Sequence, residues 1–370
     1  MIQPLTSSVD QFSVGCLEVL AHRLGAGPPQ SQPGRELHHT HLADLARESL
    51  RVCGQSTIGD RQSLVERAMA MDGAASPANF PNLLSAAARK VLDAADPYAA
   101  TTYQNWAYRM PSVPDFKPHT IIRMGAMTEM PLHVDGQGFE QWYPREEFGA
   151  VQVDSYADEF ALTARMIVDD DLGGFQEALA AAPARWSATL NRLCVRVLTS
   201  TDLLPDAVAL FDASRGNVRA AGGAPSTTEL SEMRKLARAM TGPAGEKLGY
   251  SIARVLVPPA LETTTQQVLQ RDLQIRPTTA ATAEPFRGQV DYDTEVLLAD
   301  YDTAEQVWFG FAPVSLGRGI GYCTQTGYER LAVRDYFDAR TGSRVHQFEG
   351  RFASCVVNPR AVFKNAGTGA

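Results

Sequence analysis

The sequence predicts a mixed α+β fold, and two observations lead to that prediction. Apolar side chains recur at helical spacing in residues 79–92, where Pro81 suits the first turn of a helix. Residues 106–168 and the C-terminal part of the chain are rich in β-branched and aromatic residues, with Gly and Pro at the breaks, as is typical of strands and turns. The composition, 44% hydrophobic and 21% charged, is that of a globular protein.

Length, charge and cysteine usage exclude several classes of function. The 370 residues suffice for two ordinary domains or one large interrupted domain. The net charge of −8, without any run of Lys and Arg, argues against a protein that reads DNA or RNA sequence, whereas a protein that only encloses nucleic acid can be acidic. The five scattered cysteines form no CxxC pair, so we expect free thiols. No apolar run reaches the length of a membrane span, so no membrane contact is expected.

The N-terminal region reads as a series of short helices. One helix is predicted within residues 1–25, followed by a Gly/Pro/Gln linker at 25–34 and two short helices at 40–53 and 60–71. Up to about residue 78 we therefore expect small helices on flexible joints, which make an arm and no compact domain.

Residues 106–168 predict an extended hairpin with a polar, glycine-marked tip near 135–149. A two-stranded ribbon of this length is marginal in water by itself. We therefore expect the hairpin to lie on another chain.

Later segments carry clearer local signals. A helix is predicted around Trp186, with Pro183 at its first turn. Ser226 and Glu229 match a capping box at the start of another helix. Near the C-terminus, two strands are expected to turn at Thr341–Gly342.

Three histidines lie within four positions, at His38, His39 and His41. A metal site needs three or four ligands with supporting contacts, and neither an HExxH motif nor a later Cys/His pair accompanies them. We therefore expect a solvated or interface segment in place of a metal site. A titrating histidine there would make assembly sensitive to pH.

Motifs for catalysis and cofactor binding are missing from the chain. It has no GxSxG, no Walker sequence and no GxGxxG after a strand, so no catalytic or cofactor-binding residue is predicted. The three aspartates at 169–171 precede a predicted helix, where a carboxylate caps the first turn, and this interpretation is preferred to cation binding.

Five stretches, in this order and spacing, resemble the major capsid (head) proteins of tailed phages and prophages, in particular the Mu-like major head subunit group. The chain is also similar to the capsid half of prohead protease–capsid fusion proteins. The resemblance runs over roughly residues 45–367 and is carried by NFPNLLSAAARKVL (79–92), VDDDLGGFQ (168–176), ALFDASRGNV (209–218), VLVPPALE (255–262) and FEGRFASCVVNPRAVFKNAG (348–367).

The resemblance implies the Hong-Kong-97-type capsid fold and a division of the chain into named regions. These are an N-terminal arm at 1–78, a first part of the peripheral domain at 79–215 with an extended loop at 118–168 and a spine helix at 183–201, an axial domain at 216–325, and a peripheral return at 326–370.

The function implied by the resemblance is a shell protein that assembles into pentamers and hexamers around double-stranded DNA, without sequence-specific binding. Expected partners are further copies, with portal, scaffold, protease and decoration proteins as candidates. The expected location is the virion, after assembly in the host bacterial cytoplasm. Aromatic residues dominate interface energetics, so the subunit contacts are predicted at Phe139, Trp142 and Tyr143 in the loop, with His38 and His41 in the arm.

Some relatives of this fold join their subunits through a loop lysine. Here no lysine lies between Lys117 and Lys235, which predicts a non-covalent shell. About 45 residues precede the resemblance, too few for a protease domain, so no proteolytic activity is expected.

Three other functions remain open at this point. An encapsulin-like nanocompartment would share the fold and enclose a cargo enzyme. A metal-dependent hydrolase would use His38, His39 and His41. A minor virion or scaffold protein would be present at low copy number.

Overall fold

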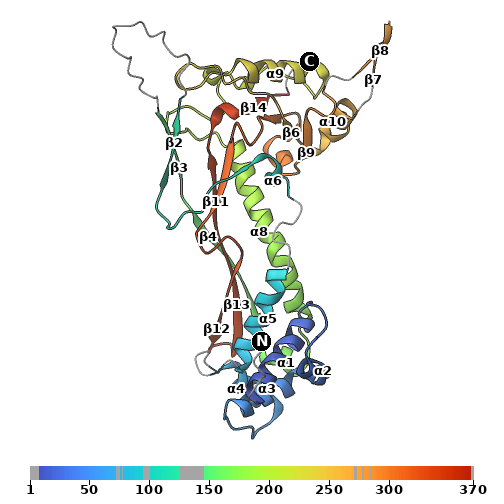
Figure 1. The fold of residues 1–370 in the computed structure, drawn as a ribbon, viewed down its shortest axis with the longest axis vertical. Coiled ribbons are helices and arrows are strands. Elements are labelled where there is room, and N and C mark those ends of the chain that lie inside the picture. Colours follow the sequence, from blue (N-terminus) through green and yellow to red (C-terminus); the bar gives the residue numbers. More distant parts are fainter. Residues whose placement is uncertain are drawn as a thin grey trace, which may run out of the picture. The chain divides into compact units, whose positions relative to one another are not determined.

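The computed structural model describes residues 8–71, 76, 78–94, 101–125, 146–270, 273–276, 279–283 and 286–367. The chain mixes helices and strands, as predicted, and forms two compact units (Figure 1). Unit 1 consists of Met1–Ala99, Ser155–Ala188 and Gly327–Arg351, and unit 2 of Ala100–Asp154, Thr189–Thr326 and Phe352–Ala370. Among the described helices, none is long and apolar enough to cross a membrane.

Unit 1 is built largely from the N-terminal helices. They are α1 (Ser8–Arg23), α2 (Gln32–Leu37), α3 (Leu42–Val52), α4 (Arg61–Met69) and α5 (Phe80–Ala94). The two short helices predicted at 40–53 and 60–71 are confirmed as α3 and α4. Asp60 caps α4 by accepting a hydrogen bond from the Ser63 amide at 3.2 Å, which fixes where that helix starts.

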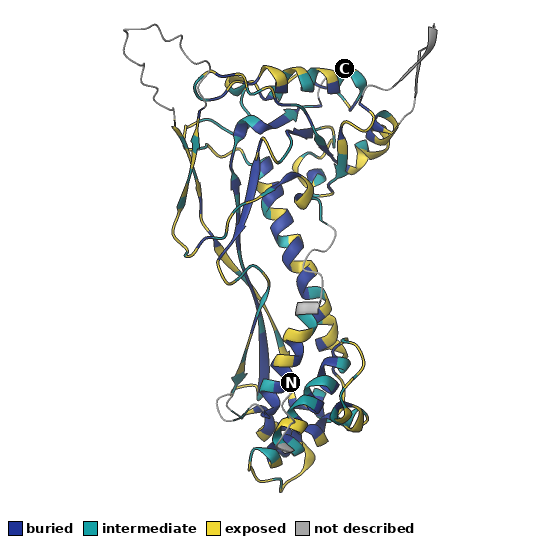
Figure 2. Cartoon of the chain, viewed as in Figure 1, coloured by how far each residue is buried: buried dark blue, intermediate teal, exposed yellow. Residues whose placement is uncertain are grey.

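These helices form a compact core, so the expectation of a jointed arm without one is wrong for the described residues. Leu20, Leu45 and Val65 are fully buried, in one cluster with Phe175 and Leu179. Buried and exposed positions both occur along these helices (Figure 2). Helices α3 and α4 each bury a row of apolar side chains in this core and keep polar ones exposed. Helices this short are marginal alone, so packing supplies most of their stability.

The Gly/Pro/Gln linker is also tied down. The Glu18 carboxylate on α1 accepts hydrogen bonds from the Ser31 amide at 2.9 Å, the Ser31 hydroxyl at 2.8 Å and the Gln30 amide at 3.1 Å. Burial alone would raise the pKa of Glu18, but these hydrogen bonds and the charge of Lys90 lower it. The segment after α1 is therefore held against that helix.

Helix α8 (Gly173–Thr199) begins well before Pro183, and the prediction that this proline opens the helix is wrong. An interior proline costs about 3 kcal/mol because it removes one hydrogen bond and clashes with the preceding turn. Phe175 and Leu179, both fully buried, lie in the turns before it. Burying two such side chains contributes roughly 1.5–3 kcal/mol each, enough to offset that cost.

The aspartate run lies between α7 (Ala164–Val168) and α8. Asp171 accepts a hydrogen bond from the amide of Gly173, the first residue of α8, at 3.0 Å, as predicted for a capping carboxylate. Asp170 forms an ion pair with Arg23 and accepts from the Leu42 amide at 3.1 Å. Asp170 and Asp171 therefore make contacts within unit 1.

The strands of unit 1 belong to a C-terminal hairpin. β12 (Ala332–Asp338) and β13 (Ser343–Val356) pair antiparallel, with Asp338 opposite Ser343. Gly342 has φ +64°, which glycine adopts without strain, so the predicted turn is confirmed. β4 (Asp154–Leu162) also pairs with β13, whose residues from Phe352 onward belong to unit 2.

Unit 2 contains a five-stranded sheet in the order β5-β14-β10-β6-β9. Ser226 caps α9 by accepting from the Glu229 amide at 3.2 Å, which confirms the predicted start. The sheet and its helices comprise β5 (Val218–Arg219), β6 (Arg254–Val257), β9 (Asp291–Thr294), β10 (Trp308–Phe311), β14 (Val362–Asn365), α9 (Thr227–Ala239) and α10 (Glu262–Leu269).

The remaining strands of unit 2 are short. β11 (Ile320–Thr324) pairs with the last part of β13 and with β1 (Tyr108–Arg109). Two ribbons, β2–β3 and β7–β8, each form a two-stranded sheet of their own. The remaining bounds are β2 (His119–Met124), β3 (Glu146–Val151), β7 (Leu273–Arg276), β8 (Thr279–Ala283), α6 (Tyr103–Trp106), α11 (Leu298–Tyr301), and the 3-10 turns η1 (Ala213–Arg215), η2 (Pro259–Leu261) and η3 (Pro359–Ala361).

Candidate subunit interface

The predicted hairpin is present among the described residues as β2 and β3, and residues 146–149, which were expected at its tip, belong to strand β3. β2 and β3 pair antiparallel from His119 opposite Val151 to Met124 opposite Glu146. The chain then continues into β4, which pairs with β13, so the hairpin does not extend to residue 168. The predicted contact residues Phe139, Trp142 and Tyr143 lie outside the described residues.

The outer face of the hairpin is exposed and carries three large apolar side chains beside Thr120 and Glu146. Ile122 and Phe148 lie opposite each other and are 55% and 52% exposed, and Met124 beside them is 67% exposed. Side chains alternate between the two faces of a strand, so these three share one face. Adjacent exposed apolar side chains typically mark a surface that another protein covers. The alternation in HTIIRM was visible in the sequence, but it did not reveal which face stays uncovered.

The inner face packs on the body of unit 2. Val151 is buried and Ile121 is half-buried, in one cluster with Val113, Cys355 and Val357. Within the described ranges, the hairpin therefore has one face packed against unit 2 and one face that is exposed.

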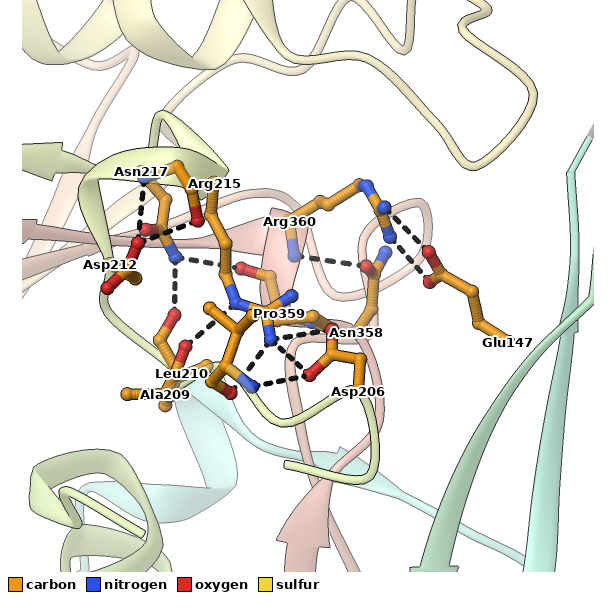
Figure 3. A network of polar contacts seen from close by, with 12 residues as sticks. Glu147, Asp206, Ala209, Leu210, Asp212, Arg215, Asn217, Asn358, Pro359 and Arg360 are labelled. Atoms are coloured by element: carbon orange, nitrogen blue, oxygen red, sulfur yellow. Dashed lines mark hydrogen bonds and ion pairs between the residues drawn. The ribbon is translucent and has the colours of Figure 1, made fainter. Parts of the chain in front are cut away.

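An ion-pair network lies near the end of the β2–β3 ladder where Met124 pairs with Glu146. The Arg360 guanidinium donates two hydrogen bonds to the Glu147 carboxylate, at 2.5 and 2.6 Å, and Arg123 pairs with the same carboxylate at 3.1 Å. Figure 3 shows Glu147 facing the guanidinium of Arg360. Partial burial would raise the pKa of Glu147, but the hydrogen bonds and charge of Arg360, aided by Arg123, hold it below its usual range. Glu147 is therefore a carboxylate at neutral pH.

Neighbouring polar groups hold this network in place. Asn358 accepts from the Arg360 amide at 3.1 Å and from the Arg123 side chain at 3.3 Å, and it donates to the Gly317 carbonyl at 2.9 Å. Close by, the buried Arg215 side chain pairs with Asp206 at 2.7 Å (Figure 3). Sequence reasoning missed this network because Glu147 and Arg360 are 213 positions apart.

The histidine cluster lies in unit 1, at the junction of α2 and α3. His41 caps α3, its Nδ1 accepting from the Ala43 amide at 3.2 Å. The ring of His38 lies 5.1 Å from that of His22 and 4.7 Å from that of His39. Desolvation, together with the nearby His39, His22 and Arg23, lowers the pKa of His38.

The rings of His22 and His39 each contact the ring of His38, whereas His41 serves as the cap of α3. Within the described ranges, no group of three or more His, Cys, Asp or Glu side chains could hold a metal ion. The role of His38 and His41 in a subunit contact stays a prediction.

Comparison with known proteins shows the family to which the chain belongs. The family described as phage capsid protein matches residues 147–365, which is more than half of the chain. The chain belongs to the phage capsid protein family. The capsid family match favours neither the nanocompartment nor the hydrolase alternative.

Solved capsid structures resemble this capsid protein in fold. The capsid of Ralstonia phage GP4 aligns with a TM-score of 0.50 at 9% identity, over 74% of this chain and 92% of that one. Capsid chains of Cyanophage Pam1 (TM-score 0.48, 9% identity, 73% and 94% covered) and of bacteriophage PhiM1 (0.46, 12%, 72% and 87%) are also similar. No curated protein matches the chain.

Proposed function

We propose that this capsid protein is the major head subunit of a tailed phage and that the β2–β3 hairpin supplies one of its subunit contacts. The evidence for this contact is that Ile122, Met124 and Phe148 are exposed on one face of a ribbon whose other face packs on unit 2. In a ring of identical subunits, such a face contacts a different surface of the next copy. Such heterologous contacts close into rings of five or six subunits.

The sequence between β2 and β3 adds a second, sequence-based reason for a contact here. It carries Phe139, Trp142 and Tyr143, residue types that dominate interface energetics. Each contact can be modest, because many contacts per subunit act together once rings form. Further candidate partners are portal, scaffold, protease and decoration proteins.

The role proposed for the chain is structural and non-enzymatic. With a net charge of −8, the wall encloses double-stranded DNA without reading its sequence. No lysine lies between Lys117 and Lys235, so the shell is held by non-covalent contacts. Assembly takes place in the host bacterial cytoplasm, and the product is the head of the virion.

Sedimentation of the purified full-length protein tests the proposed contact. The wild-type protein is expected to form fast-sedimenting shells or capsomer rings. The Ile122→Ser/Phe148→Ser double variant should stay in slow-sedimenting fractions at concentrations where wild type assembles. Ile58→Ser is the matched control, because Ile58 is an exposed apolar residue (85%) outside the hairpin. A double variant that sediments like wild type would exclude the hairpin face as a contact.

A further inference from the structure

The direction of the β2–β3 hairpin is set by side chains. In the part of the chain that the structure describes, β2 and β3 pair only with each other, so no backbone ladder joins the ribbon to the larger sheets. The apolar contacts of Ile121 and Val151 hold the ribbon against unit 2, but apolar packing is weakly directional. A directional contact is needed to fix the angle at which the outer face is presented.

The Glu147–Arg360 pair supplies that directional contact. Two parallel hydrogen bonds between a guanidinium and a carboxylate fix both distance and orientation. The side chains of Glu147 and Arg360 are 26% and 19% exposed, so solvent screens the pair less than it would at the open surface. Arg123, on the paired strand β2, contacts the same carboxylate, so the pair engages both strands of the ribbon.

Arg360 itself stands on a rigid base. It belongs to η3, which follows Asn358 and leads directly into β14. The fully buried Asn217 side chain donates to the carbonyls of Pro359 at 3.1 Å and Leu210 at 2.8 Å (Figure 3). Asn358 donates to the Tyr250 hydroxyl at 3.2 Å. The Arg360 guanidinium therefore contacts the hairpin from a backbone segment that is fixed by hydrogen bonds to Asn217 and Asn358.

We propose that Glu147 is the positioning residue of the hairpin. Through Arg360 it sets the direction in which Ile122, Met124 and Phe148 face the next subunit. This inference rests on the proposed function, because it assigns Glu147 a role in the same contact. Glu147 lies on the ribbon itself and is partly exposed, and its ion pairs are with Arg360 and Arg123, so its loss should release the ribbon first.

Hydrogen exchange of the unassembled full-length protein tests the positioning role. Glu147→Gln keeps the shape of the side chain and removes its charge. Amides of β2 and β3 should exchange about tenfold faster in this variant, while those of β6, β10 and β14 stay unchanged. Arg254→Met is the matched control, because Arg254 forms the same type of half-buried ion pair with Asp293, at 2.8 Å, elsewhere in unit 2. It should leave the hairpin unchanged.

Two outcomes would overturn the proposal. Unchanged exchange in the hairpin would show that Glu147 does not hold it, and a uniform increase across unit 2 would show a general structural role. Arg360→Lys keeps the charge and loses the two-pronged geometry, so it should release the hairpin as well. Glu147→Asp keeps the carboxylate and should restore part of the protection.

Assembly provides the second readout. Glu147→Gln should raise the protein concentration needed for shell formation by about tenfold relative to wild type and Arg254→Met. An unchanged threshold despite a released hairpin would break the link to assembly. A wild-type protein that never assembles would count against the proposed function, whereas the exchange measurement would still decide the positioning role.

Discussion

Ile122 on β2 and Phe148 on β3 lie directly opposite each other, and more than half of each side chain is exposed. A cross-strand apolar pair normally stabilises a sheet by being covered. Among the described residues, side chains of the subunit pack only on the other face of the ribbon. Under the proposed function, the pair contributes most of its stabilising effect when a second copy buries it.

Replacing this pair should prevent assembly and leave the folding of the single subunit almost unchanged. Since both side chains are exposed in the subunit, Ile122→Ser/Phe148→Ser should change the free energy of unfolding of the unassembled protein by only about 0.5 kcal/mol per site. Chemical denaturation of the unassembled protein measures this. A loss of several kcal/mol would show that the face is already packed within the subunit.

Acid should destabilise unit 1 through His346. This side chain is fully buried on β13 against Phe175, and among the described residues neither ring nitrogen has a hydrogen-bond partner. Burial lowers the pKa of His346 to about 4; the Asp335 carboxylate opposes this shift and the Arg344 guanidinium adds to it.

The sign follows from proton binding. Between about pH 6.5 and 4 the unfolded chain binds a proton at this histidine and the folded chain does not. The free energy of unfolding should therefore decrease by about 3 kcal/mol as the pH is lowered through this range. His346→Phe should remove this part of the dependence in denaturation measured at several pH values. An identical pH dependence in wild type and variant would contradict the assignment.

Thiol reactivity should distinguish one cysteine from the other four. Cys53 is half-buried, whereas Cys16, Cys194, Cys323 and Cys355 are buried. Burial raises the pKa of the Cys355 thiol to about 12 and that of Cys323 to about 11, and the reactive species is the thiolate.

A disulfide reagent should therefore modify one thiol per unassembled native subunit quickly and the rest only after denaturation. Cys53→Ser should remove the fast phase. A fast phase of two or more thiols would show that one of the buried sites opens readily.

Boiled particles should release single chains. No lysine lies between Lys117 and Lys235, so the hairpin loop offers no amine for a cross-link. Denaturing gel electrophoresis should show one band near 40.2 kDa. A ladder of covalent multimers would contradict the non-covalent shell.

Signals that act within a few residues were readable from the sequence. The Ser226 cap, the turn at Gly342 and the two short helices α3 and α4 were predicted because neighbouring residues determine them. Pro183 was misjudged because tertiary packing of Phe175 and Leu179 outweighs a local helix-breaking preference.

The candidate site could be predicted only in part. The hairpin follows from composition, but the direction of its faces depends on what packs beneath them. The Glu147–Arg360 pair joins residues 213 positions apart, and neither residue carries a local signal. For the same reason the compact core of the N-terminal helices, which the sequence suggested was a loose arm, appears only once their apolar faces are placed together.

Negative-stain electron microscopy of the purified, recombinantly expressed protein tests the central claim most directly. The account predicts closed shells or rings of five and six subunits, with shell formation lost in Ile122→Ser/Phe148→Ser. Small discrete oligomers alone, also when the protein is produced together with candidate scaffold and protease proteins, would contradict it.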